Sequence, residues 1–180
     1  MTQRKGKVVW FTGMSGSGKS TLANHLNEYA LSKNIKSLLI DGDAIRNQYS
    51  IKMGFTYDDV KKNNLQIAKI CKENAEIFSL VLVAVISPYS DIRAQVKKYL
   101  DGNYYLVFCN SSIESLRKRD VKGLYEKADR KEIDNLIGYS LGSIYEKPAD
   151  PYLKLNTSNE KDLESNKHEI RNLLKTLIIE

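Results

Sequence analysis

One short stretch constrains the fold of this chain more than any other. Residues 13–20 read GMSGSGKS; they follow a β-branched and aromatic run at 7–13 and precede helically spaced apolar residues over 19–34. They fit the pattern G-x-x-x-x-G-K-[ST], in which glycines let several backbone N–H groups face one anion at the positive end of a helix. A flexible glycine–serine turn with an exposed lysine is the alternative, but a strand before and a helix after favour phosphate binding. The stretch therefore predicts a strand–loop–helix unit that binds a nucleoside triphosphate.

Strand-like and helix-like segments alternate along the rest of the chain. The run LVLVAVISP at 80–88 is apolar almost throughout, which is typical of a central parallel strand covered on both faces. Alternation of this kind predicts an α/β fold with an open parallel sheet of about five strands and helices on both faces. Ligands of such sheets bind at the carboxyl ends of the strands. We expect further strands at 36–43, 104–110 and 152–157, and helices at 56–79, 91–100, 111–119 and 160–178.

Size, charge and cysteine content narrow the class of protein. A chain of 180 residues predicts one domain over 1–180. The net charge of +6 comes from scattered basic residues beside acids, which suits small polyanions and predicts no nucleic-acid partner. No apolar run approaches the ~20 residues of a membrane helix, and the start lacks a signal-peptide pattern, so we expect a cytoplasmic protein without membrane association. Cys71 and Cys109 lack the spacing of a metal site or redox pair, and we expect them to pack in the core.

The side chains of the phosphate loop suit a triphosphate bound with Mg²⁺. Lys19 can reach the β- and γ-phosphates, and the Ser20 hydroxyl can join the magnesium shell. The guanine-specific N-K-x-D pattern is absent, because NEKD at 159–162 carries an inserted residue. The predicted triphosphate-binding residues in this stretch are Gly13, Ser15, Gly16, Ser17, Gly18, Lys19, Ser20 and Thr21.

The sequence DGDAIR at 41–46 supplies acids at the end of the second expected strand. Asp41 and Asp43 lie two residues apart, so both can point into the cleft. One can orient or accept the proton of an attacking hydroxyl, and the other can hold a metal-bound water. Arg46 can bind an acceptor phosphate through two parallel hydrogen bonds. An acidic turn that caps a helix is the simpler alternative for this motif.

With these residues in view, the chain resembles the adenylylsulfate kinase family, whose members are P-loop kinases. The similar segments occur in the family's order between residues 8 and 157, and no common small-kinase relative shares the whole series. They are GMSGSGKS (13–20), DGDAIR (41–46), GFT (54–56), DVKKN (59–63), ISPY (86–89), RDVKGLYEKA (119–128) and YEKPADPYLKLNT (145–157).

The resemblance implies transfer of the ATP γ-phosphate to the ribose 3′-hydroxyl of a small nucleotide, with Mg²⁺ as cofactor. It implies Lys19, Asp41 and Asp43 as catalytic residues, Asp43 as base, and Ser20 and Asp41 (through water) at the metal. Arg119 would bind ATP, and a mobile lid would span roughly 119–148. Dimers are common in the family, so a homodimer is possible. The implied acceptor-binding residues are Asp43, Arg46, Phe55, Asn63, Ile86, Ser87, Pro88, Tyr89, Lys122, Leu124 and Tyr125.

The departures from the family pattern lie mainly on the acceptor side. Val60 stands where the family has an arginine directed at the acceptor's anionic tail, and NNLQ at 63–66 lacks two further cations. The family's second aromatic around the base has no clear counterpart, with Leu136 or Tyr139 as the candidate replacement. Two acceptors therefore stay open: adenylylsulfate, with these changes compensated, or cytidine diphosphoramidate, which a relative phosphorylates in capsule-modification pathways.

Two other classes of function compete with a nucleotide 3′-kinase. A small-metabolite kinase of the same architecture would not need the ISPY and KGLY segments. A non-catalytic nucleotide sensor would not need to keep Lys19, Ser20, Asp41 and Asp43. Dependence of ATP turnover on an added nucleotide distinguishes the kinase from the sensor.

Overall fold

The computed structural model describes residues 5–47 and 54–179. Five strands form one sheet in the order β2-β3-β1-β4-β5, and every neighbouring pair is parallel. This confirms the predicted α/β fold of P-loop kinases. The strands are β1 (Lys7–Thr12), β2 (Ser37–Asp41), β3 (Leu80–Ala84), β4 (Tyr104–Asn110) and β5 (Leu153–Asn156).

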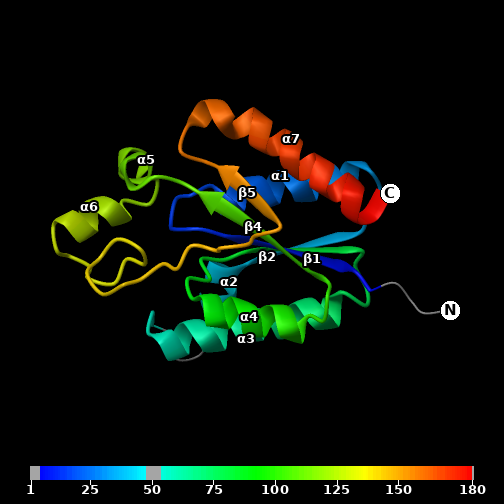
Figure 1. The fold of residues 1–180 in the computed structure, drawn as a ribbon, viewed down its shortest axis with the longest axis horizontal. Helices are drawn as coiled ribbons and strands as arrows, with labels where there is room; N and C mark the ends of the chain where they lie inside the picture. The colour runs from blue at the N-terminus through cyan, green and yellow to red at the C-terminus, as the bar shows by residue number, and fades with distance from the viewer. Residues whose placement is uncertain (1–4, 48–53, 180) are drawn as a thin grey trace.

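Helices cover both faces of the sheet (Figure 1). On one face lie α1 (Lys19–Ser32) and α7 (Leu163–Leu174), and on the other lie α3 (Tyr57–Asn74) and α4 (Ser90–Tyr99). The short helices are α2 (Gly42–Asn47), α5 (Ile113–Arg119) and α6 (Leu124–Asp129), with a 3₁₀ turn at Glu160–Asp162 and a π-helical turn at Lys175–Ile179.

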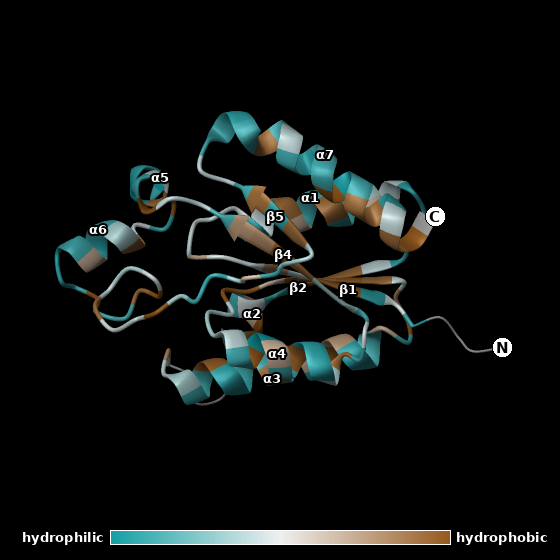
Figure 2. Cartoon of the chain, viewed as in Figure 1, coloured by the Kyte–Doolittle hydropathy of each residue, from teal (hydrophilic) through white to brown (hydrophobic). Residues whose placement is uncertain are grey.

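Alternate residues of the central strands pack into two separate cores. On β1, Val9 and Phe11 face α1 and α7, whereas Val8 and Trp10 face α3 and α4. Because both faces are covered, the central strands are mostly apolar and the helices show their polar sides outward (Figure 2). The predicted packing roles of Cys71 and Cys109 agree with their places in these two cores as free, buried thiols.

Several elements end earlier than the sequence pattern predicts. The expected strand at 36–43 ends at Asp41, because an oxygen of the Asp41 carboxylate accepts hydrogen bonds from the backbone N–H groups of Asp43 and Ala44 and so begins α2. The expected strand at 80–88 ends at Ala84. The segment after it turns at Ser87, whose φ is 47°.

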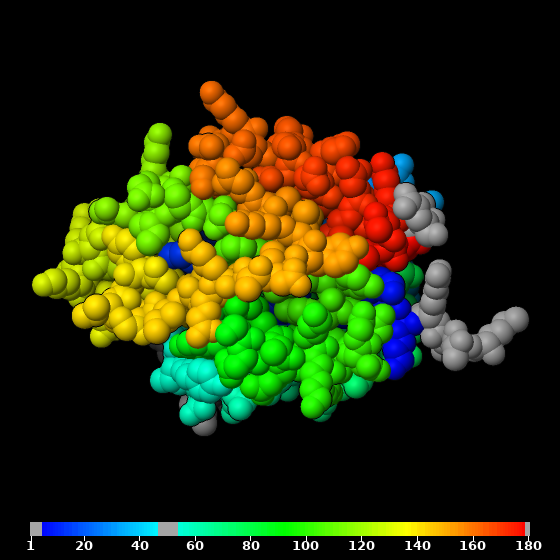
Figure 3. Space-filling view, viewed as in Figure 1, coloured from blue at the N-terminus to red at the C-terminus, as the bar shows by residue number. Residues whose placement is uncertain are grey.

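The segment after β4 projects beyond the carboxyl ends of the strands. Figure 3 shows residues of about 115–150, in green to orange, as a lobe beside the layered body. The sequence pattern indicated turns there, and α6 is an additional short helix within the segment. No helix in the described parts of the chain, 5–47 and 54–179, is long and apolar enough to cross a bilayer.

Leu82→Ala should lower the free energy of unfolding by about 2–5 kcal/mol, because it opens a cavity on a central strand. Leu82 is fully buried in β3, between the sheet and α1. Urea unfolding would measure the change. Leu31→Ala, at a half-exposed position of α1, is the control and should change stability by no more than about 0.5 kcal/mol. Equal effects of the two substitutions would contradict this assignment of the core.

Candidate active site

A cavity of about 270 Å³ lies at the carboxyl ends of the central strands. It brings together the phosphate loop, the acids after β2, the end of β3 and the segment after α5. Its lining residues are Ser15, Gly16, Gly18, Lys19, Ser20, Thr21, Asp41, Asp43, Ala84, Val85, Ile86, Arg119, Val121 and Lys122.

The phosphate loop follows β1 so closely that its first glycine cannot be replaced without displacement. A Cβ at Gly13 would lie 2.5 Å from Ser17 Oγ and 2.6 Å from the carbonyl oxygen of Cys109 on β4. Gly18 has a φ of 87° immediately before α1. These two glycines therefore allow the tight turn that the sequence motif predicts, and α1 begins at Lys19.

Lys19 is a buried cation held by the loop itself. Its ammonium donates a hydrogen bond to the carbonyl oxygen of Met14 at 2.8 Å. Burial lowers the pKa of Lys19 to about 8, and the nearby carboxylates of Asp43 and Asp41 oppose that shift only in part. A bound polyphosphate would favour the charged form, because it brings negative charge to an amine that has lost most of its water.

The two acids after β2 have different surroundings. One oxygen of Asp41 caps α2, and Gly42 packs so close to Val85 that a Cβ would lie 2.6 Å from its Cγ2. Asp43 is exposed in the cavity, and its Oδ2 accepts a hydrogen bond from Lys122 Nζ at 3.0 Å. The Asp41 carboxylate therefore caps α2, as the simpler alternative for this motif predicts. Both Asp41 and Asp43 nevertheless line the cavity.

The oxygen atoms in this cavity fit a magnesium ion that arrives with a triphosphate. Mg²⁺ favours oxygen ligands and usually keeps several waters while binding one or two carboxylates plus substrate phosphates. Ser20 and Asp41 offer a hydroxyl and a carboxylate at the phosphate loop. Within 5–47 and 54–179, no group of three or more His, Cys, Asp or Glu residues could hold a metal by itself.

The segment after α5 is folded onto the phosphate loop. The Tyr125 hydroxyl donates to the carbonyl oxygen of Ser15 at 2.8 Å, and its ring is buried with Met14, Leu116 and Leu136. Gly138 approaches the same cluster, since a Cβ there would lie 2.8 Å from Met14 Cε. The loop and this segment therefore share one small apolar core.

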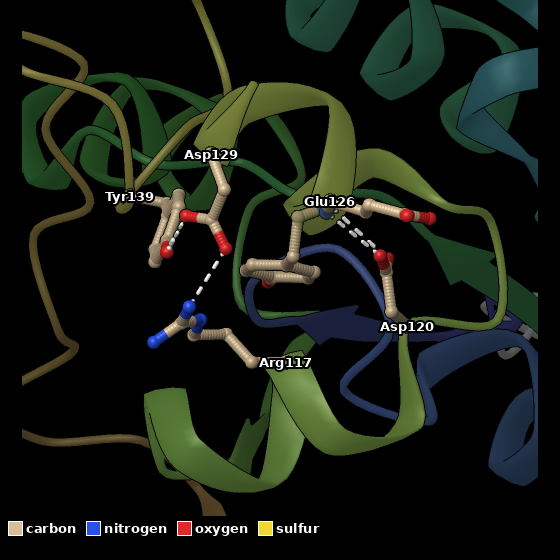
Figure 4. Close-up of polar contacts among 6 residues, drawn as sticks. Arg117, Asp120, Glu126, Asp129 and Tyr139 are labelled. Atoms are coloured by element: carbon tan, nitrogen blue, oxygen red, sulfur yellow. Dashed lines mark hydrogen bonds and ion pairs between the residues drawn. The ribbon is translucent and has the colours of Figure 1, made fainter. Parts of the chain in front are cut away.

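Polar contacts hold the segment in its own fold (Figure 4). Arg117 Nη2 donates to Asp129 Oδ2 at 2.7 Å, and the Tyr139 hydroxyl donates to the other carboxylate oxygen. These hydrogen bonds, first from Tyr139 and then from Arg117, lower the pKa of Asp129. The Asp120 carboxylate accepts from the backbone N–H groups of Tyr125 and Glu126 and so caps α6.

A second cavity adjoins the first along α1, and most of its lining was not predicted from the sequence. It measures about 130 Å³ and shares Gly18, Thr21 and Arg119 with the phosphate cavity. Arg119 is held by a hydrogen bond to Ser111 Oγ at 2.6 Å. The serine- and asparagine-rich turn after β5 gave no recognisable motif. The remaining lining residues are Leu22, Thr157, Asn159, Glu160, Leu163 and Asn166.

The residues expected at the acceptor lie in three places. Asp43, Ile86 and Lys122 line the phosphate cavity. Arg46 stacks over the exposed Phe55 ring, with 4.4 Å between the guanidinium carbon and the ring centroid. In the third place, Leu124 and Tyr125 pack in the apolar cluster built on Met14, Leu116, Tyr125 and Leu136, here called the Met14 cluster.

Asn63, Ser87, Pro88 and Tyr89 form the rest of the expected acceptor side. Asn63 and Ser87 are buried, and among the described residues neither the Asn63 amide nor the Ser87 hydroxyl has a hydrogen-bond partner. Such buried polar groups ordinarily bind something. Tyr89 packs against Tyr57 with 5.0 Å between ring centroids, and Pro88 is buried beside it in the chain.

Val60 is fully covered by apolar side chains. It clusters with Ile92 and Ile137, and Ile86 and Tyr89 pack against this cluster. Leu136 and Tyr139, the two candidates for the second aromatic position, both pack in the Met14 cluster instead. Ile137, which lies between them in the sequence, belongs to the Val60 cluster, and Tyr145 packs against that cluster as well.

Comparisons with known proteins agree on one family. The sequence matches the family model for adenylylsulphate kinase over residues 5–156. An adenylyl-sulfate kinase of Acaryochloris marina is 41% identical over 155 residues, which cover 85% of this chain and 74% of that protein. The solved structure of the Mycobacterium tuberculosis APS kinase CysC in complex with AMPPNP and APS is 34% identical, with a TM-score of 0.85 over 95% of this chain and 98% of that one.

ATP affinity should fall as the pH rises above about 8, by up to about tenfold for each pH unit. Below its lowered pKa of about 8, Lys19 is already charged and can bind phosphate. Above that pH, the neutral amine of Lys19 must first take up a proton. Fluorescence titration with an ATP analogue across this range would measure the dissociation constant. Lys19→Met should bind weakly at every pH, without this decline. A wild-type affinity that is constant through the same range would contradict the assignment.

Proposed function

Because the chain belongs to the adenylylsulphate kinase family, we propose that it transfers the γ-phosphate of ATP to the ribose 3′-hydroxyl of a nucleotide with a modified diphosphate. As a member of this family it is an ATP-dependent kinase that acts on a nucleotide hydroxyl, with ATP and Mg²⁺. One observation carries the proposal: Lys19, Asp43 and Lys122 meet in a single cavity at the carboxyl ends of the strands.

On the donor side, the phosphate loop would bind the triphosphate and the adjoining cavity would bind the base. Lys19 would exchange its bond to the Met14 carbonyl for the β- and γ-phosphates. Arg119 lines both cavities and would lie between phosphate and base. Ser20 and Asp41, the latter through a water, would hold Mg²⁺, whose charge would neutralise the phosphates.

On the acceptor side, Asp43 would act on the attacking hydroxyl. Its carboxylate is exposed in the cavity and reaches Lys122 across it. Asp43 would accept the proton of the 3′-hydroxyl, and Lys122 would move to the phosphates as charge develops there. Arg46 and Phe55 would bind the acceptor nucleotide, with the buried amide of Asn63 supplying hydrogen bonds.

We propose that residues 1–180 form a single domain and that residues 119–148 form its lid. Residues 1–4, 48–53 and 180 lie outside the described ranges. Two contacts support this: Lys122 reaches Asp43, and Tyr125 reaches the Ser15 carbonyl. The lid would thus close over the acceptor with one end already fixed to the phosphate loop. The homodimer that the resemblance implies stays a prediction.

Two acceptors are consistent with this site, and different observations favour each. Adenylyl-sulfate kinases at about 40% identity, and a similar structure that holds APS, favour adenylylsulfate. The apolar cover over Val60 and the placement of Tyr139 in the Met14 cluster favour cytidine diphosphoramidate. Its tail has an amino group in place of one terminal oxygen of the sulfate, so it offers fewer acceptor oxygens to cationic side chains at the same charge. Its base is a single ring, so it needs a smaller stacking surface.

Asp43→Asn should lower kcat by about 10²–10⁴-fold and leave ATP affinity nearly unchanged, because it removes a base and not a phosphate ligand. Coupled ADP release in the presence of the acceptor would measure kcat, and fluorescence titration would measure ATP binding. Asp58→Asn, at an exposed position in the first turn of α3, is the matched control. Full activity of Asp43→Asn would overturn the role of this carboxylate.

With Mg²⁺–ATP, we expect kcat/KM for cytidine diphosphoramidate to exceed kcat/KM for adenylylsulfate by about tenfold or more. A factor of this size is expected when adenylylsulfate lacks one charge-assisted contact. The measurement is coupled ADP release with each nucleotide in a separate reaction. Higher turnover of adenylylsulfate would show that the changes around Val60 are compensated. ADP release without any added nucleotide, or with neither of these two, would contradict the proposed kinase.

A further inference from the structure

Arg93 is a buried cation that the proposed chemistry does not use. It lies on α4 with only 5% of its surface exposed. Its Nη1 donates to the carbonyl oxygen of Ser87 and its Nη2 to the carbonyl oxygen of Glu146, each at 2.7 Å. A buried charge is costly unless it is well hydrogen-bonded, so a guanidinium in this place must satisfy a specific structural need.

One of its two partners lies on a strained part of the expected acceptor side. Ser87 has a left-handed backbone, with a φ of 47°, which is unfavourable for a residue other than glycine. Such a conformation persists only where surrounding contacts hold it. The Thr12 hydroxyl donates to the carbonyl oxygen of Ile86 just before it, and Arg93 holds the carbonyl of Ser87 itself.

The other partner lies where the lid segment returns to the sheet. The backbone N–H of Glu146 donates to the carbonyl oxygen of Pro88 at 2.9 Å. The Glu146 carboxylate in turn accepts from the backbone N–H and the hydroxyl of Ser90, at the start of α4. The Tyr145 hydroxyl is 3.0 Å from Thr12 Oγ1. Hydrogen bonds therefore join residues 86–90 to residues 145–146, with donors in both segments. Arg93 donates to one carbonyl oxygen in each segment.

We propose that Arg93 is a positioning residue that fixes the acceptor-side segment 86–89 and the end of the lid, residues 145–146, in one arrangement. Its planar fork directs two N–H groups at two carbonyls from different segments, which the single ammonium of a lysine cannot do in the same geometry. Arg93 lines none of the phosphate or base cavities described above. Arg93 therefore affects the reaction indirectly, and this inference rests on the proposed acceptor site.

The first test needs no substrate. In the full-length protein, Arg93→Lys should speed amide exchange at residues 89–90 and 145–147 by about tenfold or more and leave the phosphate loop at 13–19 unchanged. Hydrogen–deuterium exchange with mass spectrometry measures this. Lys97→Met, an exposed cation on the same helix, is the control and should change neither segment. Unchanged exchange at both segments in Arg93→Lys would overturn the proposal whatever the enzyme's acceptor is.

The second test asks whether the positioning matters for the acceptor. Arg93→Lys should raise KM for the preferred nucleotide by about tenfold while KM for ATP stays within about twofold. Equal increases for both substrates would show general damage and overturn the role. Glu146→Gln, at an exposed residue whose carboxylate accepts from Ser90, should shift the acceptor KM in the same direction but less. If no acceptor is turned over by the wild type, the proposed function fails while the exchange result still decides the role of Arg93.

Discussion

The site depends on one buried charge, the ammonium of Lys19 at the carboxyl end of β1. It is held by the Met14 carbonyl at 2.8 Å, and burial lowers its pKa to about 8. The Met14 carbonyl partly compensates for the water that the ammonium loses, and bound phosphate would do so more strongly because it is charged. The close approach of Gly13 to Cys109 on β4 leaves the loop no room to move toward the sheet.

The same loop also packs against the proposed lid, residues 119–148. Met14 of the phosphate loop packs with Tyr125 and Leu136. Tyr125 adds a hydrogen bond to the carbonyl of Ser15. The phosphate loop and the proposed lid therefore share side chains, which would give a physical route by which one substrate affects the site of the other. At its far end the proposed lid contacts the expected acceptor side through Glu146 and Arg93.

The donor side is formed mainly by residues that are close together in the sequence, whereas the expected acceptor side is formed by residues that are far apart in it. The phosphate loop is a continuous motif in a fixed strand–helix context, so the sequence predicts both its geometry and its ligand. The acceptor side is assembled from α2, the start of α3, the segment after β3 and the lid, which meet only in the folded chain. Tyr139 illustrates this: it is the natural candidate for a missing aromatic by position, yet its hydroxyl binds Asp129 and its ring packs on Tyr125.

By itself, the sequence determined that about five parallel strands alternate with helices along the chain. It also determined the phosphate loop and the acids at the end of the second strand, since each depends on residues close together in the chain. It also predicted the family through motifs of that kind. Only the tertiary structure decided that Asp41 caps α2 while Asp43 reaches Lys122, that Val60 is covered by Ile92 and Ile137, and that Arg93 holds Ser87 and Glu146 together. Asp43 and Lys122 lie 79 positions apart in the chain, and Arg93 and Glu146 lie 53 apart. No local pattern encodes which of such side chains will meet once the sheet has formed.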